Sequence, residues 1–106
     1  MTAAGELKYR LVLEAPVETP DGQGGVALSY ATAATVWASL QPAADRPDTA
    51  AGGRGAVVTH HIIIRAGPEL TTRHRFRLDT RIFRVVAVRE QDAGRFLFVH
   101  AEEKTD

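Results

Sequence analysis

Alternation of apolar and polar residues with a period of two runs through most of this chain and constrains its fold more than any other feature. Leu7, Leu11 and Leu13 alternate with charged residues, and similar runs follow along the chain. A period of two places the apolar side chains on one face of a strand. Proline, glycine and aspartate separate the runs, and these residues favour turns. The predicted strands are residues 7–14, 26–30, 36–41, 57–65, 74–78, 81–89 and 96–101.

Seven short strands without an amphipathic helix predict an all-β fold, a small antiparallel β-barrel or sandwich of about six to seven strands. In this interpretation Pro16 ends the first strand, and residues 31–35 are ambiguous and open to one helical turn. The length of 106 residues suits one domain with a modest core, so we expect residues 1–106 to form a single domain. No apolar run is long enough to cross a bilayer, and the first residues lack the pattern of a secretory signal.

Two segments look unlike strands. Residues 42–56 contain two prolines, three glycines and no large apolar side chain. Such a segment buries too little surface to offset the entropy of ordering it. We therefore expect a long mobile loop at 42–56, and we expect the polar tail 102–106 to fray.

The late hairpin can be predicted in register. If Asp79 and Thr80 form a two-residue turn, the cross-strand pairs are Leu78 with Arg81, Arg77 with Ile82, Phe76 with Phe83, and Arg75 with Arg84. Opposed residues share a face. One face then carries Phe76, Phe83 and Val85 and is expected to face the core. The other carries Arg73, Arg75, Arg77 and Arg84, with the apolar residues Ile82, Val86 and Val88.

Charge is balanced overall but divided along the chain. Residues 54–95 hold nine arginines against four carboxylates, a local net charge of +5, and the rest of the chain has a net charge of −5. This division suits binding to nucleic acid, or a chain that meets copies of itself through opposite patches. The outer arginines of the hairpin are candidates for an acidic partner. The acidic side chains that could meet them on another copy are Glu14, Glu18, Glu102 and Glu103.

Residues for catalysis or metal binding are few. There is no cysteine, and the adjacent His60 and His61 point to opposite faces of a strand, so they cannot chelate one metal together. A cross-strand pair of His60 with His74 is the remaining metal alternative. No phosphate-binding loop or nucleophile elbow is present, and Glu102 and Glu103 are interpreted as a solvated terminal pair. We therefore assign no catalytic, metal or cofactor site, and we expect no small-molecule substrate and no membrane.

Trp37 is the one tryptophan and has two interpretations. It could stack a nucleic-acid base, as aromatic residues do on single-strand binders. We favour the alternative of a large core residue beside Val36 and Leu40.

The order and spacing of these segments resemble the tailed-phage head–tail joining proteins, also called head-completion or stopper proteins. The resemblance covers about Leu7 to Glu103. It is carried by Glu14–Glu18, the turn at 21–25, the block 34–42, the strand 58–65, and the alternation of Arg81, Phe83 and Val85 before a final strand.

The resemblance implies a structural protein of a virion neck, from a phage or a phage-like gene transfer agent, that is present in the host cytoplasm during assembly. It implies a hexameric or dodecameric ring with the portal or adaptor above, the tail terminator or tube below, and packaged DNA in its channel. Candidate channel or assembly residues in the loop are Arg46, Asp48 and Arg54. Candidate interface residues are Arg73, Arg75, Arg77 and Arg84. The alternative is an OB-like nucleic-acid-binding module that uses the arginine-rich strands.

Overall fold

Six antiparallel strands form the fold in the computed structural model, which describes residues 7–47 and 57–104. They are β1 (Tyr9–Pro20), β2 (Val26–Pro47), β3 (Val57–Arg65), β4 (Arg75–Leu78), β5 (Arg81–Gln91) and β6 (Phe96–Lys104). None of the described residues forms a helix that could span a membrane.

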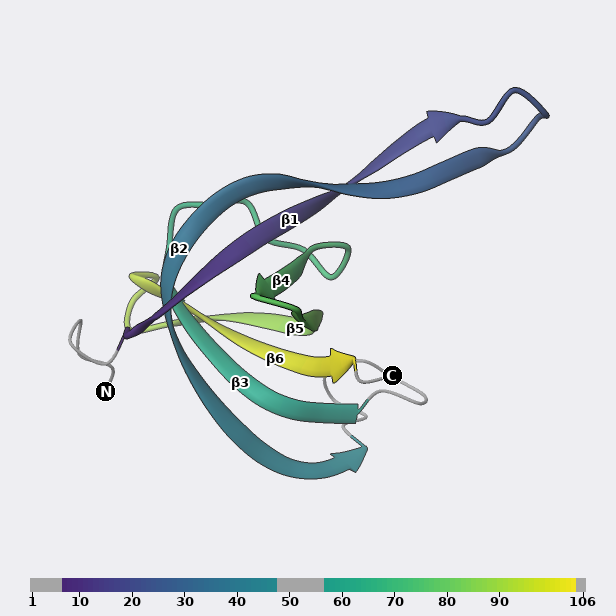
Figure 1. Cartoon of the computed structure of the whole chain (residues 1–106). Coiled ribbons are helices and arrows are strands. Elements are labelled where there is room, and N and C mark those ends of the chain that lie inside the picture. The colour runs from purple at the N-terminus through teal and green to yellow at the C-terminus, as the bar shows by residue number, and fades with distance from the viewer. Residues whose placement is uncertain (1–6, 48–56, 105–106) are drawn as a thin grey trace.

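The six strands close into a small barrel in the order β1-β2-β3-β6-β5-β4 (Figure 1). β4 completes the ring by pairing with β1, where Val12, Leu13 and Glu14 lie opposite Arg77, Phe76 and Arg75. The all-β prediction of a small antiparallel barrel is confirmed. Closure pairs both edges of most strands in the barrel, which leaves few open edges there.

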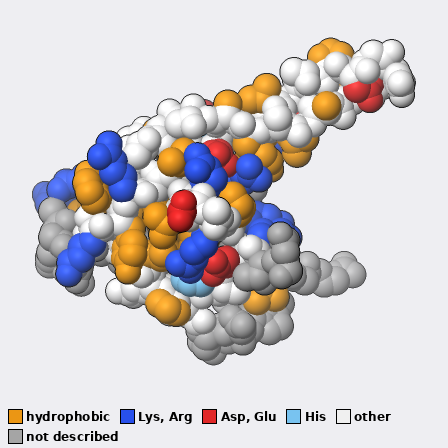
Figure 2. All heavy atoms as spheres, viewed as in Figure 1, with side chains coloured by type: hydrophobic (Ala, Val, Ile, Leu, Met, Phe, Trp, Pro, Cys, Tyr) orange, Lys and Arg blue, Asp and Glu red, His pale blue; other side chains and the backbone are white. Residues whose placement is uncertain are grey.

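The β1–β2 hairpin is longer than the barrel and projects from it (Figure 1). We call residues 15–31 the arm, because β1 has no partner other than β2 after Glu14, and we call the rest of the described chain the body. The six residues of β1 in the arm span about 20 Å at the usual rise of a strand. The molecule is accordingly elongated, with extents of 50 × 28 × 27 Å, and the arm stands clear of the body (Figure 2).

Two predicted interruptions are wrong, because β1 and β2 are each continuous. β1 runs through Pro16 to Pro20. The backbone N–H of Asp21 donates to the carbonyl of Gly25, and hydrogen-bonded pairs alternate along an antiparallel ladder. Pro16 and Pro20 therefore occupy positions whose nitrogen faces the free edge of the arm, where a proline removes no ladder hydrogen bond.

β2 joins the strands predicted at 26–30 and 36–41, and the helical alternative for 31–35 is wrong. A register shift lies between Leu13 and Glu14, where Ala33 of β2 has no partner in β1. Such a bulge bends a strand without ending it. β2 can therefore belong to the barrel at one end and to the arm at the other.

The predicted loop and tail are partly strand. Residues 42–47 continue β2, and the pairing of Arg46 with Val58 extends the ladder beyond a second register shift. The other part of the loop, residues 48–56, lies outside the described residues. Residues 102–104 belong to β6, where the carboxylates of Glu102 and Glu103 are hydrogen-bonded by arginines of β5. The predicted fraying is therefore wrong for 102–104, and residues 105–106 are not described.

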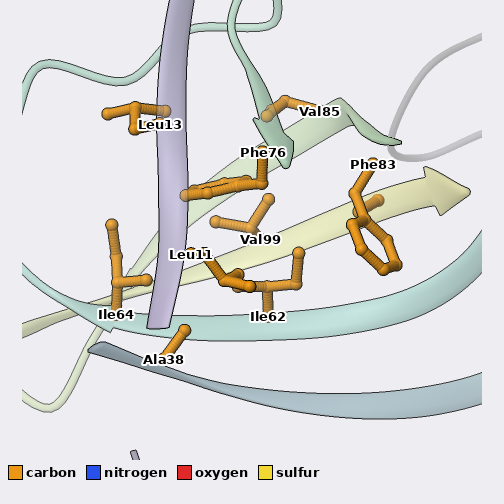
Figure 3. Packing of buried hydrophobic residues seen from close by; sticks show 10 residues of the cluster. Leu11, Leu13, Ala38, Ile62, Ile64, Phe76, Phe83, Val85 and Val99 are labelled. Atoms are coloured by element: carbon orange, nitrogen blue, oxygen red, sulfur yellow. The ribbon is translucent and has the colours of Figure 1, made fainter. Parts of the chain in front are cut away.

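The core lies inside the barrel and collects the inward residues of all six strands (Figure 3). Phe76 and Phe83 are cross-strand partners and are fully buried, and Val85 is almost fully buried, as predicted from the hairpin register. The other residues of the main cluster are Leu11, Leu13, Ala38, Ile62, Ile64, Val99 and Ala101.

The outer apolar row predicted on β5 is only partly present. A register shift between Val85 and Ala87 displaces the strand after Val85. Val86 turns into a second cluster with Val58, and Val88 packs against the main core. The prediction that these two valines lie on the outer face with the arginines is wrong, because the bulge changes the face of every later residue.

Candidate functional site

The predicted arginine face exists, and it is held together by carboxylates of the same chain. The four predicted cross-strand pairs of the β4–β5 hairpin are confirmed, from Arg75 with Arg84 to Leu78 with Arg81. Because Phe76 points inward, Arg75 and Arg77 point outward, where the pairing of β4 with β1 brings Glu14 between them. Arg75 Nε donates to Glu14 Oε1 at 2.7 Å, and Arg77 Nε donates to Glu14 Oε2 at 3.0 Å.

Glu14 is the most buried carboxylate of this face. Burial alone would raise its pKa, since a charged form is poorly solvated there. Hydrogen bonds from Arg75 and Arg77, together with the charges of both guanidinium groups, outweigh burial and lower the pKa of Glu14. The carboxylate therefore neutralises two arginines that repulsion would otherwise separate.

The outer arginines of the face are paired too. Arg73 Nη2 contacts Glu18 at 3.4 Å, and Arg84 Nη2 donates to Glu102 at 2.8 Å. Glu14, Glu18 and Glu102, which the sequence suggested as partners on another copy, thus meet these arginines within one chain. The prediction that Arg73, Arg75, Arg77 and Arg84 contact a partner stays a prediction.

A second ionic group lies at one end of the barrel. Arg81 donates to both oxygens of Glu103, at 2.7 and 3.1 Å, and His60 Nε2 lies 3.9 Å from the same carboxylate. The hydrogen bond from Arg81 is the largest influence on Glu103, and with the nearby positive charges it lowers the pKa despite burial. The interpretation of Glu102 and Glu103 as a solvated pair is wrong, because both carboxylates are partly buried and ion-paired.

A hollow of about 300 Å³ opens between the arm and the arginine face (Figure 2). The guanidinium group of Arg75 lies 3.7 Å from the centre of the Tyr30 ring, so this contact joins the body to the base of the arm. The hollow has both apolar and cationic walls. Its lining residues are Pro16, Leu28, Tyr30, Thr72, Arg73, His74, Arg75, Ile82, Arg84 and Lys104.

The tip of the arm is a well-defined turn. The carboxylate of Asp21 accepts hydrogen bonds from the backbone N–H groups of Gln23 and Gly25, at 2.8 and 3.1 Å. Gly22 and Gly24 have φ values of 82° and 86°, which residues with a side chain rarely adopt. The sequence predicted this turn but gave no sign that it ends a projecting arm.

Trp37 is not a core residue, so that prediction is wrong. It lies on the outer face of β2 with 54% of its surface exposed, and the guanidinium group of Arg10 stacks 5.5 Å from the ring centre. The inward residues of this segment are Val36, Ala38 and Leu40. Their spacing of two was visible in the sequence and already places Trp37 on the opposite face.

The histidines form no metal site among the described residues. His60 packs edge-on against Phe83 at 5.2 Å, and His61 contacts Phe98 and His100 on the other side of the sheet. The cross-strand alternative with His74 is wrong, because β3 and β4 are not neighbours and His74 Nδ1 accepts the N–H of Thr71.

The predicted loop residues are mostly outside the described chain. Arg46 lies on β2 opposite Val58, and Asp48 and Arg54 fall in the segment that the structure does not describe.

Comparison with known proteins gives a family match and a structural match, and both are to virion proteins. The sequence matches the family described as phage head completion protein over residues 2–104. The fold is similar to a chain of the solved "Virion of native gene transfer agent (GTA) particle", with a TM-score of 0.71 and 32% identity, covering 92% of this chain and 96% of that chain. The curated proteins include no match.

Proposed function

Because the chain belongs to the phage head completion protein family, we propose that it forms a ring in the neck of a virion, between the portal or adaptor and the tail. In this function the ring closes or lines the channel for packaged DNA and offers a docking surface to the tail. The structural role in a virion follows from the family. The ring, the channel and the tail contact are the proposal.

The observation that carries the proposal is the similarity, over nearly the whole length of both chains, to a chain that is part of a gene transfer agent virion. The fold supports it in a second way. The body has a core of its own, whereas the arm and the outer face of β2 expose apolar side chains to solvent. A protein that functions inside an assembly needs such surfaces, since they become buried when neighbours arrive.

The candidate residues enter the proposal as predicted from the sequence. We propose that residues 42–56, with Arg46, Asp48 and Arg54, face the channel or a neighbouring copy. We also propose that the arginine face contacts a partner in the neck. The ring would contain six or twelve copies.

The OB-like nucleic-acid module has less support. Its binding surface would be the arginine face, where Arg73, Arg75, Arg77 and Arg84 all contact carboxylates of the chain. Phosphate binding depends on positive charges that can replace counterions. Paired arginines contribute less to such binding, so we do not propose this function.

Deletion of the gene in a producing strain tests the proposal, with negative-stain imaging of the particles and complementation by the wild-type gene as control. We expect full heads without tails, or heads that have lost their DNA, and normal particles after complementation. Normal numbers of tailed, DNA-filled particles from the deletion strain would contradict the proposed function.

A further inference from the structure

Exposed large hydrophobic residues fall into two groups at opposite ends of the β1–β2 pair. Within the described chain, Val17, Val26 and Leu28 are on the arm, and Tyr9 and Trp37 are on the body. Cross-strand pairing puts Val26 and Leu28 on one face of the arm and Val17 on the other, and the pairing of Tyr9 with the buried Ala38 puts Tyr9 on the inner face, away from Trp37. We call Val26 and Leu28 the arm patch, and we call Trp37, with Arg10 stacked on it, the tryptophan patch. Such residues, when grouped, mark surfaces that are covered in an assembly.

The two patches differ in charge. The arm, residues 15–31, contains Glu18 and Asp21 and no lysine or arginine, so its own net charge is −2, of which Arg73 of the body offsets a part at Glu18. The exposed Lys8 and Arg10 flank Tyr9, and residues 7–10 and 35–38 contain no carboxylate. Arg65 adds a third positive charge, since it follows Ile64, the partner of Ala38, and so lies beside Trp37. An acidic apolar surface and a basic aromatic surface are complementary.

One chain cannot bring its own two patches together. Leu28 lies opposite Glu18 and Trp37 lies opposite Arg10, which are eight residues apart on β1. Eight residues of strand span about 26 Å. Contact between the patches therefore requires two copies, and it uses a different surface on each. A contact of this kind repeats from copy to copy and closes into a ring when the rotation allows.

We propose that the arm patch of each copy packs on the tryptophan patch of the next copy. Val26 and Leu28 cover the ring of Trp37, and the carboxylates of Glu18 and Asp21 approach Lys8 and Arg10. The proposal rests on the proposed function, because it names the contact between subunits of the ring. Trp and Arg are the residues that most often dominate interface energies, and here they are already stacked on each other.

The arm is built to hold its direction before it meets a neighbour. At its base Arg75 stacks on Tyr30, and Arg73 contacts Glu18. At its tip Asp21 fixes the turn. A surface that is ordered in advance loses less entropy when it binds. The pair Arg73–Glu18 is exposed, so Glu18 can keep this partner and still face a neighbour.

The competing arrangement is strand pairing between two arms. On the β1 edge Pro16 and Pro20 lack the outward N–H groups that pairing needs, so β1 of one arm cannot add well to another strand. The β2 edge of the arm has no proline, so two arms could pair only β2 to β2. That contact uses the same surface on both copies and stops at a dimer.

Cross-linking in assembled particles tests the proposal. The sequence contains no native cysteine, so within this chain only the introduced cysteines can be cross-linked. The gene is replaced by a variant with Val26→Cys on the arm and Thr35→Cys beside Trp37, both at exposed positions. Purified particles are treated with a short bismaleimide and analysed for this chain on a denaturing gel. We expect a ladder of covalent oligomers from the double variant and monomer from each single variant and from wild type.

Three results would overturn the proposal. Dimers from Val26→Cys alone would show arm-to-arm pairing. Monomer from a double variant that is present in particles would show that the patches do not meet, while leaving the proposed function intact. Absence of the wild-type chain from purified particles would contradict the proposed function and the inference together.

A second variant measures the importance of the contact. Trp37→Ala should remain folded, because the side chain is exposed, yet its amount in particles should fall at least tenfold. The matched control is Gln41→Ala, an exposed residue on the same strand, which should enter particles as wild type does. Normal incorporation of Trp37→Ala would contradict the proposal.

Discussion

The body and the arm are made from the same two strands but are stabilised in different ways. In the body, β1 and β2 contribute fully buried residues such as Leu11, Leu13 and Ala38 to a core shared by six strands. In the arm, the same strands are paired only with each other and expose Val26 and Leu28. A two-stranded ribbon is marginally stable alone in water. The body therefore accounts for folding, and we propose that the arm serves contacts with other copies.

The difference shows that strand pairing and core formation are separate properties of a sequence. Both halves of the hairpin form a continuous ladder. Only the body half is extended at both edges, by β4 beside β1 and β3 beside β2, so that the sheet closes around its inner face. A substitution confined to one region therefore tests whether the stability or the assembly of the chain depends on that region.

The largest effect on stability is expected from the core. Phe83→Ala removes a fully buried ring and should lower the free energy of unfolding by about 3–5 kcal/mol. Denaturant titration measures the change. The matched control is Leu28→Ala on the arm, where the side chain is 56% exposed and the expected change is within about 0.5 kcal/mol. Similar costs for the two variants would remove the distinction between body and arm.

A smaller loss is expected from the junction of the two regions. Glu14→Gln removes the carboxylate that accepts hydrogen bonds from Arg75 and Arg77, and should cost about 1–3 kcal/mol at neutral pH. Glu18→Gln, which breaks an exposed ion pair, should cost less than about 1 kcal/mol. If Glu14→Gln is as mild as Glu18→Gln, the ionic junction does not stabilise the base of the arm.

The same junction predicts a pH dependence. The pKa of Glu14 is lower in the folded chain than its ordinary value of 4.5, so the unfolded chain binds this proton first as pH falls. Its contribution is complete above about pH 4.5 and is lost as pH falls through the folded pKa. Titrations of wild type and Glu14→Gln at several pH values should therefore converge in acid. A difference that stays constant to pH 2 would contradict the assignment.

A small effect on stability is expected at the tryptophan patch. Trp37→Ala removes an exposed ring that contacts Arg10, and should change stability by less than about 1 kcal/mol. Thermal unfolding followed by circular dichroism is sufficient to measure it. A loss of about 3–5 kcal/mol would mean that Trp37 is buried like a core residue.

The parts of the fold that depend on neighbouring residues alone could be predicted from the sequence. The β4–β5 hairpin was correct to the residue, because Asp79 accepts a positive φ of 58° and a two-residue turn leaves one register. The inward Phe76 and Phe83 followed from that register. The all-β class followed from the period of two in the other strands.

The wrong predictions concern features that depend on contacts between distant parts of the chain. Pro16 is normally a reason to end a strand, and only the free edge of the arm makes it harmless. The bulges at Ala33 and Val86 change which face later residues occupy, and no sequence pattern marks them. The in-chain partners of the arginine face could not be assigned either, because Glu14 and Arg75 become neighbours only when the barrel closes.

Shortening the arm tests whether the arm serves assembly and the body serves folding. Val17 and Ser29 are a cross-strand pair, so residues 18–28 can be replaced by an Asn-Gly turn that removes Val26 and Leu28, the arm patch. The measurement is the amount of this variant in purified particles, beside its unfolding temperature. The account predicts a change of less than about 4 °C, equivalent to about 1 kcal/mol or less, with incorporation reduced at least tenfold. A variant that enters particles normally, or that no longer unfolds cooperatively, would contradict it.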